Sequence, residues 1–252
     1  ADMGDPYVTY HNDFIESEWW ALKKIYEKNL LYKGFKIVPY CPRCGTPLSS
    51  AEVSQGYKTV KERSAVVRFK VVGEDAYFLA WTTTPWTLPS NLCLAVGKDI
   101  DYAYVNVNGS AYVACTNILG NFKNVFGEKP EIIKEVKGSD LLGITYEPIF
   151  PYFKEMKEQG AFRVVSADYV GSEEGVGIVH TAPAFGEDDY WTCKNNGIPL
   201  VNPVDAKGRF TEEITDFYPL QEDKNVIEMN PIVIRFLYDN GKAVADGTLV
   251  HN

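Results

Sequence analysis

The spacing of hydrophobic positions changes along the chain. Near the N-terminus apolar residues recur at helical spacing, which predicts an amphipathic helix over residues 12–32. The following apolar run, residues 35–40, predicts a short strand. Helical spacing returns much later and predicts two further helices, over residues 187–196 and 226–240.

Between these helices, short runs of β-branched and aromatic residues alternate with turn residues, which is typical of strands. Asn108-Gly109 separates two such runs and predicts a tight hairpin. The predicted strands cover residues 65–72, 76–81, 92–96, 102–107, 111–116, 131–136, 162–167 and 177–181. We therefore expect a mixed α+β fold that is mainly β, with a barrel-like core and peripheral helices at both ends.

Three segments follow from this pattern. Residues 1–55 hold the N-terminal helix and a C-x-x-C connecting segment, residues 56–225 form the barrel-like core, and residues 226–252 form a C-terminal return helix and tail. The chain starts and stops abruptly around these elements, so we expect it to be a segment of a longer protein.

Composition narrows the class of protein. Hydrophobic residues make up 45% of the 252 residues and charged residues 23%, which is ordinary for a globular protein with an ample core. We find no membrane-spanning run and no signal-peptide pattern. Five cysteines without the spacing of a secreted framework favour a reduced, cytoplasmic setting. The net charge of -9 argues against gripping nucleic acid with the whole surface, but it is compatible with a local contact to one RNA end.

The stretch from Trp81 to Asn91 is the first with candidate chemistry. Thr82, Thr83 and Thr84 end a predicted strand, and two prolines then impose a rigid turn. Hydroxyl and backbone N–H groups in such a turn can hold a water or a ligand oxygen. For three threonines alone, the competing interpretation as an ordinary strand end before a proline turn is the stronger one.

The second stretch runs from Gly175 to Tyr190. A strand ends at His180, a loop with proline and glycine follows, and a helix begins near Glu187, Asp188 and Asp189. Helix capping and the helix dipole explain one or two of these acids but not all three. One acid is therefore a candidate anchor for a cationic ligand group. A lone histidine in a strand more often has a structural role, yet the other two histidines lie near the termini.

Cys41 and Cys44 form a C-x-x-C pair, which is half of a typical zinc site. A closed structural site takes four ligands, and the sequence contains no second pair of this kind. A reduced pair without metal and a zinc site are both open at this point.

The two stretches Trp81–Asn91 and Gly175–Tyr190 resemble the signature peptides of the editing (CP1) domain of isoleucyl-tRNA synthetases, a class I aminoacyl-tRNA synthetase family. Residues 10–20 and 40–50 resemble the segments that lead into that insertion. Valyl- and leucyl-type domains typically carry arginine in place of Thr84, and lysine or a hydrophobic residue in place of His180. The H-x-G-H and Lys-Met-Ser-Lys-Ser motifs of amino-acid activation are absent from this sequence, so we expect no activation by this fragment.

This resemblance implies hydrolytic proofreading of mischarged valyl-tRNA(Ile), and of valyl-adenylate as a further substrate. Valine lacks one methylene of isoleucine, which a hydrophobic pocket distinguishes poorly; the isoleucyl enzyme is itself the standard example of this limit. A second, smaller site must then hydrolyse what the first accepts wrongly. The implied partners are the 3′ acceptor end of tRNA(Ile) and the catalytic core of the parent synthetase.

The resemblance also implies roles for single residues. Editing needs no cofactor, and zinc is expected at Cys41 and Cys44 only in the full-length enzyme. A ribose hydroxyl of the substrate is the expected general base, because the motifs contain no obvious one. By motif position, Asp189 anchors the substrate ammonium group, with Asp188 as its competitor. Thr82, Thr83 and Thr84 hold the attacking water. Trp86 and His180 form the pocket wall, and Asn91 lies near the terminal adenosine.

Three alternatives remain beside this interpretation. A valyl- or leucyl-type editing domain would share the fold, but Thr84 and His180 argue against it. A non-enzymatic module could dock the 3′ end of tRNA, although the acidic composition disfavours strong docking. An unrelated β-barrel hydrolase such as an aspartic protease would need paired D-T/S-G motifs, which this sequence lacks.

Overall fold

The computed structural model describes residues 4, 6–173 and 175–251, so positions 1–3 and 252 of the predicted outer segments lie outside the described residues. The chain divides into two compact units, residues 1–36 and residues 37–252, each described separately below. These units differ from the three predicted segments, because the C-x-x-C segment and the C-terminal region belong to the same unit as the central strands.

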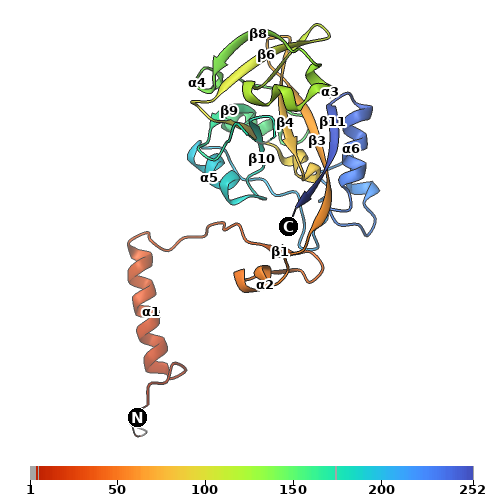
Figure 1. The fold of residues 1–252 in the computed structure, drawn as a ribbon. Helices are drawn as coiled ribbons and strands as arrows, with labels where there is room; N and C mark the ends of the chain where they lie inside the picture. The colour runs from red at the N-terminus through yellow and green to blue at the C-terminus, as the bar shows by residue number, and fades with distance from the viewer. Residues whose placement is uncertain (1–3, 5, 174, 252) are drawn as a thin grey trace. The chain divides into compact units, whose positions relative to one another are not determined.

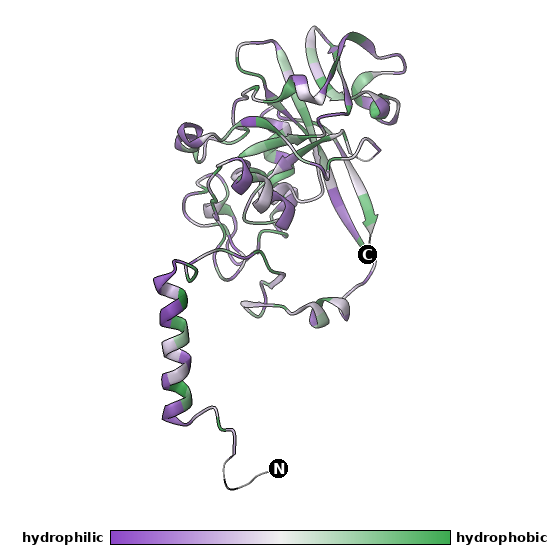
Figure 2. Ribbon diagram, turned by 90° about the vertical axis from the view of Figure 1, so that its left-hand side faces the viewer, coloured by the Kyte–Doolittle hydropathy of each residue, from purple (hydrophilic) through white to green (hydrophobic). Residues whose placement is uncertain are grey.

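The first unit contains helix α1, Asn12–Glu27. The helix starts where the pattern predicts and ends before residue 32, because Asn29 adopts a left-handed conformation at φ 57°. Its N–H bonds back to the carbonyl of Tyr26, which closes the last turn. Within the unit α1 carries both hydrophobic and hydrophilic stripes (Figure 2), and its two tryptophans, Trp19 and Trp20, are exposed.

The second unit begins with a small hairpin of β1, Tyr40–Cys41, and β2, Thr46–Pro47, followed by helix α2, Ser50–Ser54. The prediction of a strand over residues 35–40 is wrong except at Tyr40. Residues 35–39 belong to no strand in the structure, and Phe35 is exposed, so this apolar run lacks the pairing that a strand requires.

All the predicted strands from residue 65 to residue 181 are confirmed. They form part of two larger sheets, one of six strands in the order β11-β3-β4-β7-β6-β8 and one of three in the order β10-β5-β9 (Figure 1). The strands are β3 Val60–Lys70, β4 Ala76–Thr82, β5 Cys93–Val96, β6 Asp101–Val107, β7 Ser110–Cys115, β8 Glu131–Lys137, β9 Arg163–Ser166, β10 Ile178–Thr181 and β11 Ala243–His251.

The six-stranded sheet is open, with β11 and β8 at its edges, so the described strands form no closed barrel. The mixed, mainly β fold is confirmed, and the barrel-like description needs this correction. Neighbouring strands pair antiparallel except at β4–β7 and β5–β9, where pairing is parallel. Asn108 and Gly109 both have positive φ, at 53° and 92°, which confirms the predicted hairpin between β6 and β7.

Strand β11 was not indicated by the sequence pattern, which predicted a tail there. It pairs antiparallel with β3, from Ala243 opposite Val67 to His251 opposite Val60. Helix α6 precedes it and contacts both β3 and β11 (Figure 1). The remaining helical elements are η1 Pro85–Ser90, η2 Thr116–Asn121, α3 Lys123–Phe126, α4 Gly138–Leu141, η3 Lys154–Gln159, α5 Glu187–Asn195, η4 Tyr218–Leu220 and α6 Asn230–Asp239.

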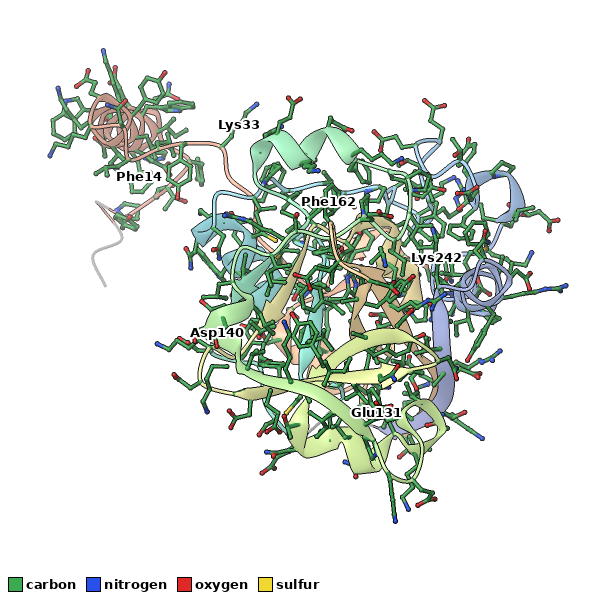
Figure 3. The ribbon with its side chains drawn as sticks, turned by 90° about the horizontal axis from the view of Figure 1, so that it is seen from above. Phe14, Lys33, Glu131, Asp140, Phe162 and Lys242 are labelled. Carbon is green, nitrogen blue, oxygen red and sulfur yellow. The ribbon has the colours of Figure 1, made fainter. Side chains whose placement is uncertain are left out.

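The hydrophobic core of the second unit lies along these strands. Every residue of β5 is buried, so this strand is covered on both faces. Phe162 lies inside the unit, whereas Glu131 and Asp140 project from its periphery (Figure 3). None of the described helices is long and apolar enough to cross a membrane.

Candidate functional site

The threonine stretch forms a turn at the end of β4. Thr82 is the last residue of the strand, and its Oγ1 accepts a hydrogen bond from the Thr84 N–H at 3.0 Å. Pro85 then starts η1, where its missing N–H is tolerated. Thr87 Oγ1 donates to the Thr84 carbonyl at 2.8 Å. Three threonine hydroxyls are thus brought together, and the partly exposed Thr83 is not among them.

Helix α6 holds this turn from the other side. The Trp86 N–H donates to Asn230 Oδ1 at 3.0 Å, and Asn230 is almost fully buried. The Trp86 ring meets Phe185 edge-on, with centroids 4.7 Å apart. Because Phe185 belongs to the loop after β10, this contact joins the two stretches singled out in the sequence. Asn230 was missed by sequence reasoning, because it lies far along the chain in an ordinary helical pattern.

His180 in β10 also joins the two stretches, through both ring nitrogens. Its Nε2 lies 2.7 Å from Thr87 Oγ1, and its Nδ1 lies 3.0 Å from Asn91 Nδ2. Burial lowers the pKa of His180 to about 4, so the ring is neutral at physiological pH. A neutral ring with both nitrogens engaged inside the protein has no free atom for general-base catalysis.

Asn91 is buried, and both ends of its amide have hydrogen-bond partners within the protein. Its Nδ2 donates to the Cys93 carbonyl at 2.9 Å as well as facing His180, and its Oδ1 accepts from the Tyr146 hydroxyl at 2.7 Å. These contacts hold the Asn91 side chain inside the protein, and its expected contact with a terminal adenosine stays a prediction. The structure places Asn91 as a support for His180.

The three acids at the start of α5 differ in their surroundings. Glu187 and Asp188 are exposed, as expected for acids in the first turn of a helix. Asp189 is half-buried, and its Oδ2 accepts a hydrogen bond from the Ala182 N–H at 2.9 Å. Burial raises the pKa of Asp189 to about 6, with a smaller raising contribution from the charge of Asp188. Among the described residues, no hydrogen bond occupies its second oxygen.

A cavity of about 560 Å³ lies in the second unit, with part of its wall formed by the same two strands, β4 and β10. It contains none of the predicted site residues, but Trp81 and Val179 in its wall directly precede Thr82 and His180 in the sequence. Tyr169 also lines it, and burial, followed by the nearby charge of Asp189, raises the pKa of this tyrosine. Among the described residues, the lining consists of Trp81, Tyr169, residues 171–173 and residues 175–179.

Cys41 and Cys44 lie away from this site, in the β1–β2 hairpin. The Cys44 N–H points to Cys41 Sγ at 3.4 Å and lowers the pKa of the Cys41 thiol. The hairpin is held to the rest of the unit by Tyr40, whose hydroxyl donates to the Ala206 carbonyl at 2.7 Å. Within the described residues, no third histidine, cysteine or acid joins the two thiols, so they amount to half of a zinc site.

Comparison with known proteins assigns the family. The model of tRNA synthetases class I (I, L, M and V) matches residues 1–228. This chain belongs to that family.

The class I synthetase chain is similar to curated isoleucine–tRNA ligases. It is 55% identical over 213 residues to the enzyme of Clostridium tetani, covering 84% of this chain and 20% of that protein. It is 52% identical over 237 residues to that of Clostridium kluyveri, covering 94% and 22%. An archaeal relative, from Picrophilus torridus, is 45% identical over 253 residues, covering 100% and 24%. The chain therefore spans about a fifth to a quarter of the length of these relatives.

Solved structures of editing domains share the fold of this synthetase chain. The crystal structure of GlLeuRS-CP1 matches with a TM-score of 0.55 at 14% identity, covering 73% of this chain and 99% of that one. The P. knowlesi cytosolic leucyl-tRNA synthetase editing domain matches with a TM-score of 0.50 at 11% identity, covering 75% and 97%. The expected resemblance to a synthetase editing domain is thus confirmed for both family and fold.

Proposed function

We propose that this chain hydrolyses valine from mischarged valyl-tRNA(Ile), and that valyl-adenylate is a further substrate. The observation that carries the proposal is Asp189, a half-buried carboxylate with one oxygen that has no hydrogen bond among the described residues, near Tyr169 in the wall of a cavity. A carboxylate in this environment is stabilised by the arrival of a cation, and the substrate of an editing site offers an ammonium group. The similarity to isoleucine–tRNA ligases supports isoleucine tRNA as the acceptor.

The cavity receives the terminal adenosine in this proposal. Its volume is within the range of small-molecule sites, and the rings of Trp81 and Tyr169 offer apolar surfaces for a base. The aminoacyl ester then extends past Trp81 and Val179 towards the threonine turn. Asp189 Oδ1 binds the ammonium group, and the exposed Asp188 is the weaker candidate because solvent screens its charge.

Hydrolysis at this site needs a positioned water and no covalent nucleophile. Thr82, Thr83 and Thr84 hold the water near the ester carbonyl carbon, which replaces a bimolecular encounter by a fixed geometry. The water oxygen bonds to that carbon, the ester C–O bond breaks, and the ribose oxygen takes the proton. Since His180 is neutral and fully hydrogen-bonded, a neighbouring ribose hydroxyl is the better general base.

Selection against isoleucine follows from a pocket that is too small for its extra methylene. Trp86 and His180 form its wall in this proposal, because each is held by hydrogen bonds or ring contacts on more than one side. A wall of fixed side chains is needed for such selection, because a mobile one would yield to a single methylene.

The proposed partners are the 3′ end of tRNA(Ile) and the catalytic core of a parent synthetase in the cytoplasm. Zinc at Cys41 and Cys44 requires two more ligands, since the described residues bring no third possible ligand to these two thiols. In that setting zinc would have a structural role, crosslinking the hairpin to another segment. The proposed hydrolysis does not depend on it.

The test is release of the amino acid from valyl-tRNA(Ile) and isoleucyl-tRNA(Ile), each incubated with the chain. We expect release of valine, little release of isoleucine, and loss of both in Asp189→Asn. Release of both amino acids at equal rates would contradict the proposal. If neither is released, calorimetry with a non-hydrolysable valyl-adenosine amide distinguishes a docking module, which binds it, from a chain without an editing site.

A further inference from the structure

Tyr146 is a buried residue to which neither the sequence motifs nor the proposed reaction assigns a role. Its ring lies between Phe69 and Phe162, with edge-on contacts at centroid distances of 5.3 and 6.2 Å. Its backbone is held as well, because the Tyr146 N–H donates to the Phe162 carbonyl at 3.0 Å. Phe162 itself lies deep inside the unit (Figure 3). The Tyr146 hydroxyl is therefore presented at a fixed position.

The partner of this hydroxyl is the Asn91 amide, and one backbone group determines which way that amide points. The Cys93 carbonyl can only accept a hydrogen bond, so the Asn91 atom at 2.9 Å from it must be the nitrogen, Nδ2. Asn91 Oδ1 then faces Tyr146 and must accept from its hydroxyl at 2.7 Å. Burial raises the pKa of Tyr146 well above its ordinary value, so the hydroxyl keeps its proton.

The same reasoning extends to His180. Because Asn91 Nδ2 is a donor, His180 Nδ1 must be an unprotonated acceptor, and the ring proton lies on Nε2. That proton is donated to Thr87 Oγ1, whose own proton goes to the Thr84 carbonyl. All donors along this path point the same way, from Tyr146 through Asn91 and His180 to the threonine turn.

We infer that Tyr146 is a positioning residue for the editing site, which acts through Asn91 to hold the orientation of the His180 ring. The inference rests on the proposed function only where it concerns substrate selection. Without the Tyr146 hydroxyl, Asn91 Oδ1 is a buried acceptor without a donor, and the amide loses one of its two fixed ends. The His180 ring then gains access to other orientations, while the Cys93 and Thr84 carbonyls still fix its tautomer.

Substrate selection is the property that depends on this run of hydrogen bonds from Tyr146 to the threonine turn. A pocket that discriminates one methylene has little free energy to work with, so small shifts of its wall reduce discrimination. Tyr146 is not among the residues that line the cavity, and its hydroxyl donates to Asn91 rather than to the acid cluster. Its loss is therefore expected to relax selection more than it slows hydrolysis of the correct ester.

The experiment combines nitrogen NMR of histidine-labelled protein with the release assay, for the wild-type chain, Tyr146→Phe and Tyr152→Phe. Tyr152 is the matched control, because its buried hydroxyl donates to Asp216 and takes no part in the His180 path. His180→Gln identifies the His180 signals by their absence. We expect the Nε2–H tautomer in all three proteins, and shifted or broadened His180 signals only in Tyr146→Phe.

In the release assay, the ratio of valine to isoleucine release is expected to fall about fivefold in Tyr146→Phe and to stay unchanged in Tyr152→Phe. An Nδ1–H tautomer in the wild type overturns the inference without any variant. So does an unchanged His180 spectrum in a folded Tyr146→Phe protein. A wild-type chain with the expected tautomer but no hydrolysis of either ester refutes the proposed function and supports the Tyr146 path.

Discussion

His180 and Asp189 lie on either side of one short loop, and burial acts on both. It lowers the pKa of the histidine to about 4 and raises that of the aspartate to about 6. Both shifts favour the neutral form, yet the two surroundings differ. Both nitrogens of His180 have partners, whereas Asp189 has one oxygen bound to Ala182 and one without a hydrogen bond among the described residues. A side chain whose hydrogen-bonding atoms all have partners suits the wall of a pocket. A side chain with an unpaired oxygen suits contact with a ligand.

The largest expected effect comes from removing the charge of Asp189. Asp189→Asn should lower kcat/KM for valyl-tRNA hydrolysis by about 10- to 100-fold, the range of one hydrogen bond to a charged group. Asp188→Asn, which neutralises the exposed neighbour, should change it little. A larger loss in Asp188→Asn than in Asp189→Asn would reverse the assignment of the anchor.

When His180 is substituted, we expect substrate selectivity to change more than the rate of hydrolysis. His180→Ala empties part of the wall, so hydrolysis of isoleucyl-tRNA should rise relative to valyl-tRNA by about tenfold. His180→Gln, which refills much of the space with a polar side chain, should retain more of the selectivity. The measurement is the ratio of the two kcat/KM values, and an unchanged ratio in a folded His180→Ala protein would reduce His180 to a packing role.

The pH dependence separates the two residues without a large structural change. Asp189 is protonated below its pKa of about 6, so its attraction for an ammonium group is lost as the pH falls. Lowering the pH from about 7 to about 5 should reduce kcat/KM about tenfold relative to Asp189→Asn at the same pH. His180 stays neutral in this range, because its pKa is about 4. A pH profile parallel to that of Asp189→Asn would argue against titration of Asp189.

The smallest effect is expected where α6 supports the turn. Asn230→Ala leaves the buried Trp86 N–H without its acceptor and should lower the free energy of unfolding by about 1–2 kcal/mol. Asn230→Asp keeps an acceptor oxygen and should lose less. Denaturant unfolding of the three proteins measures the difference, and equal stability would mean that the N–H finds another partner.

Local sequence patterns were sufficient for the central strands but not for their arrangement. The hairpin at Asn108-Gly109 connects neighbours in the chain, so a turn signal predicts it. The parallel pairing of β4 with β7 involves no such signal. Strand β11 escaped prediction because Asp246-Gly247 suggests a turn; in the structure Asp246 is held in the strand by Arg63 and Tyr238.

The site shows the same limit. The residues of the two motifs could be proposed from the sequence, because each motif is contiguous and resembles a family signature. The residues that hold these motifs in place could not be proposed in this way. Trp86 is hydrogen-bonded to Asn230, 144 positions away, and Asn91 to Tyr146, 55 positions away. A single tyrosine or asparagine in an ordinary apolar run carries no sign of its partner. The three hydrogen-bond partners of Asn91 likewise become visible only in the fold.

The pairing of β3 with β11 has a consequence for how the second unit can be carried by a larger protein. Val60 and His251 are register partners, so the first residue of β3 and the last residue of β11 lie opposite each other in the six-stranded sheet. Paired strands lie about 5 Å apart, hence a host polypeptide interrupted here would keep its two broken ends side by side. Such a graft requires little loop-closure entropy beyond that of a short surface turn. The unit can thus be accommodated as a lateral outgrowth of its host, on a two-stranded stem.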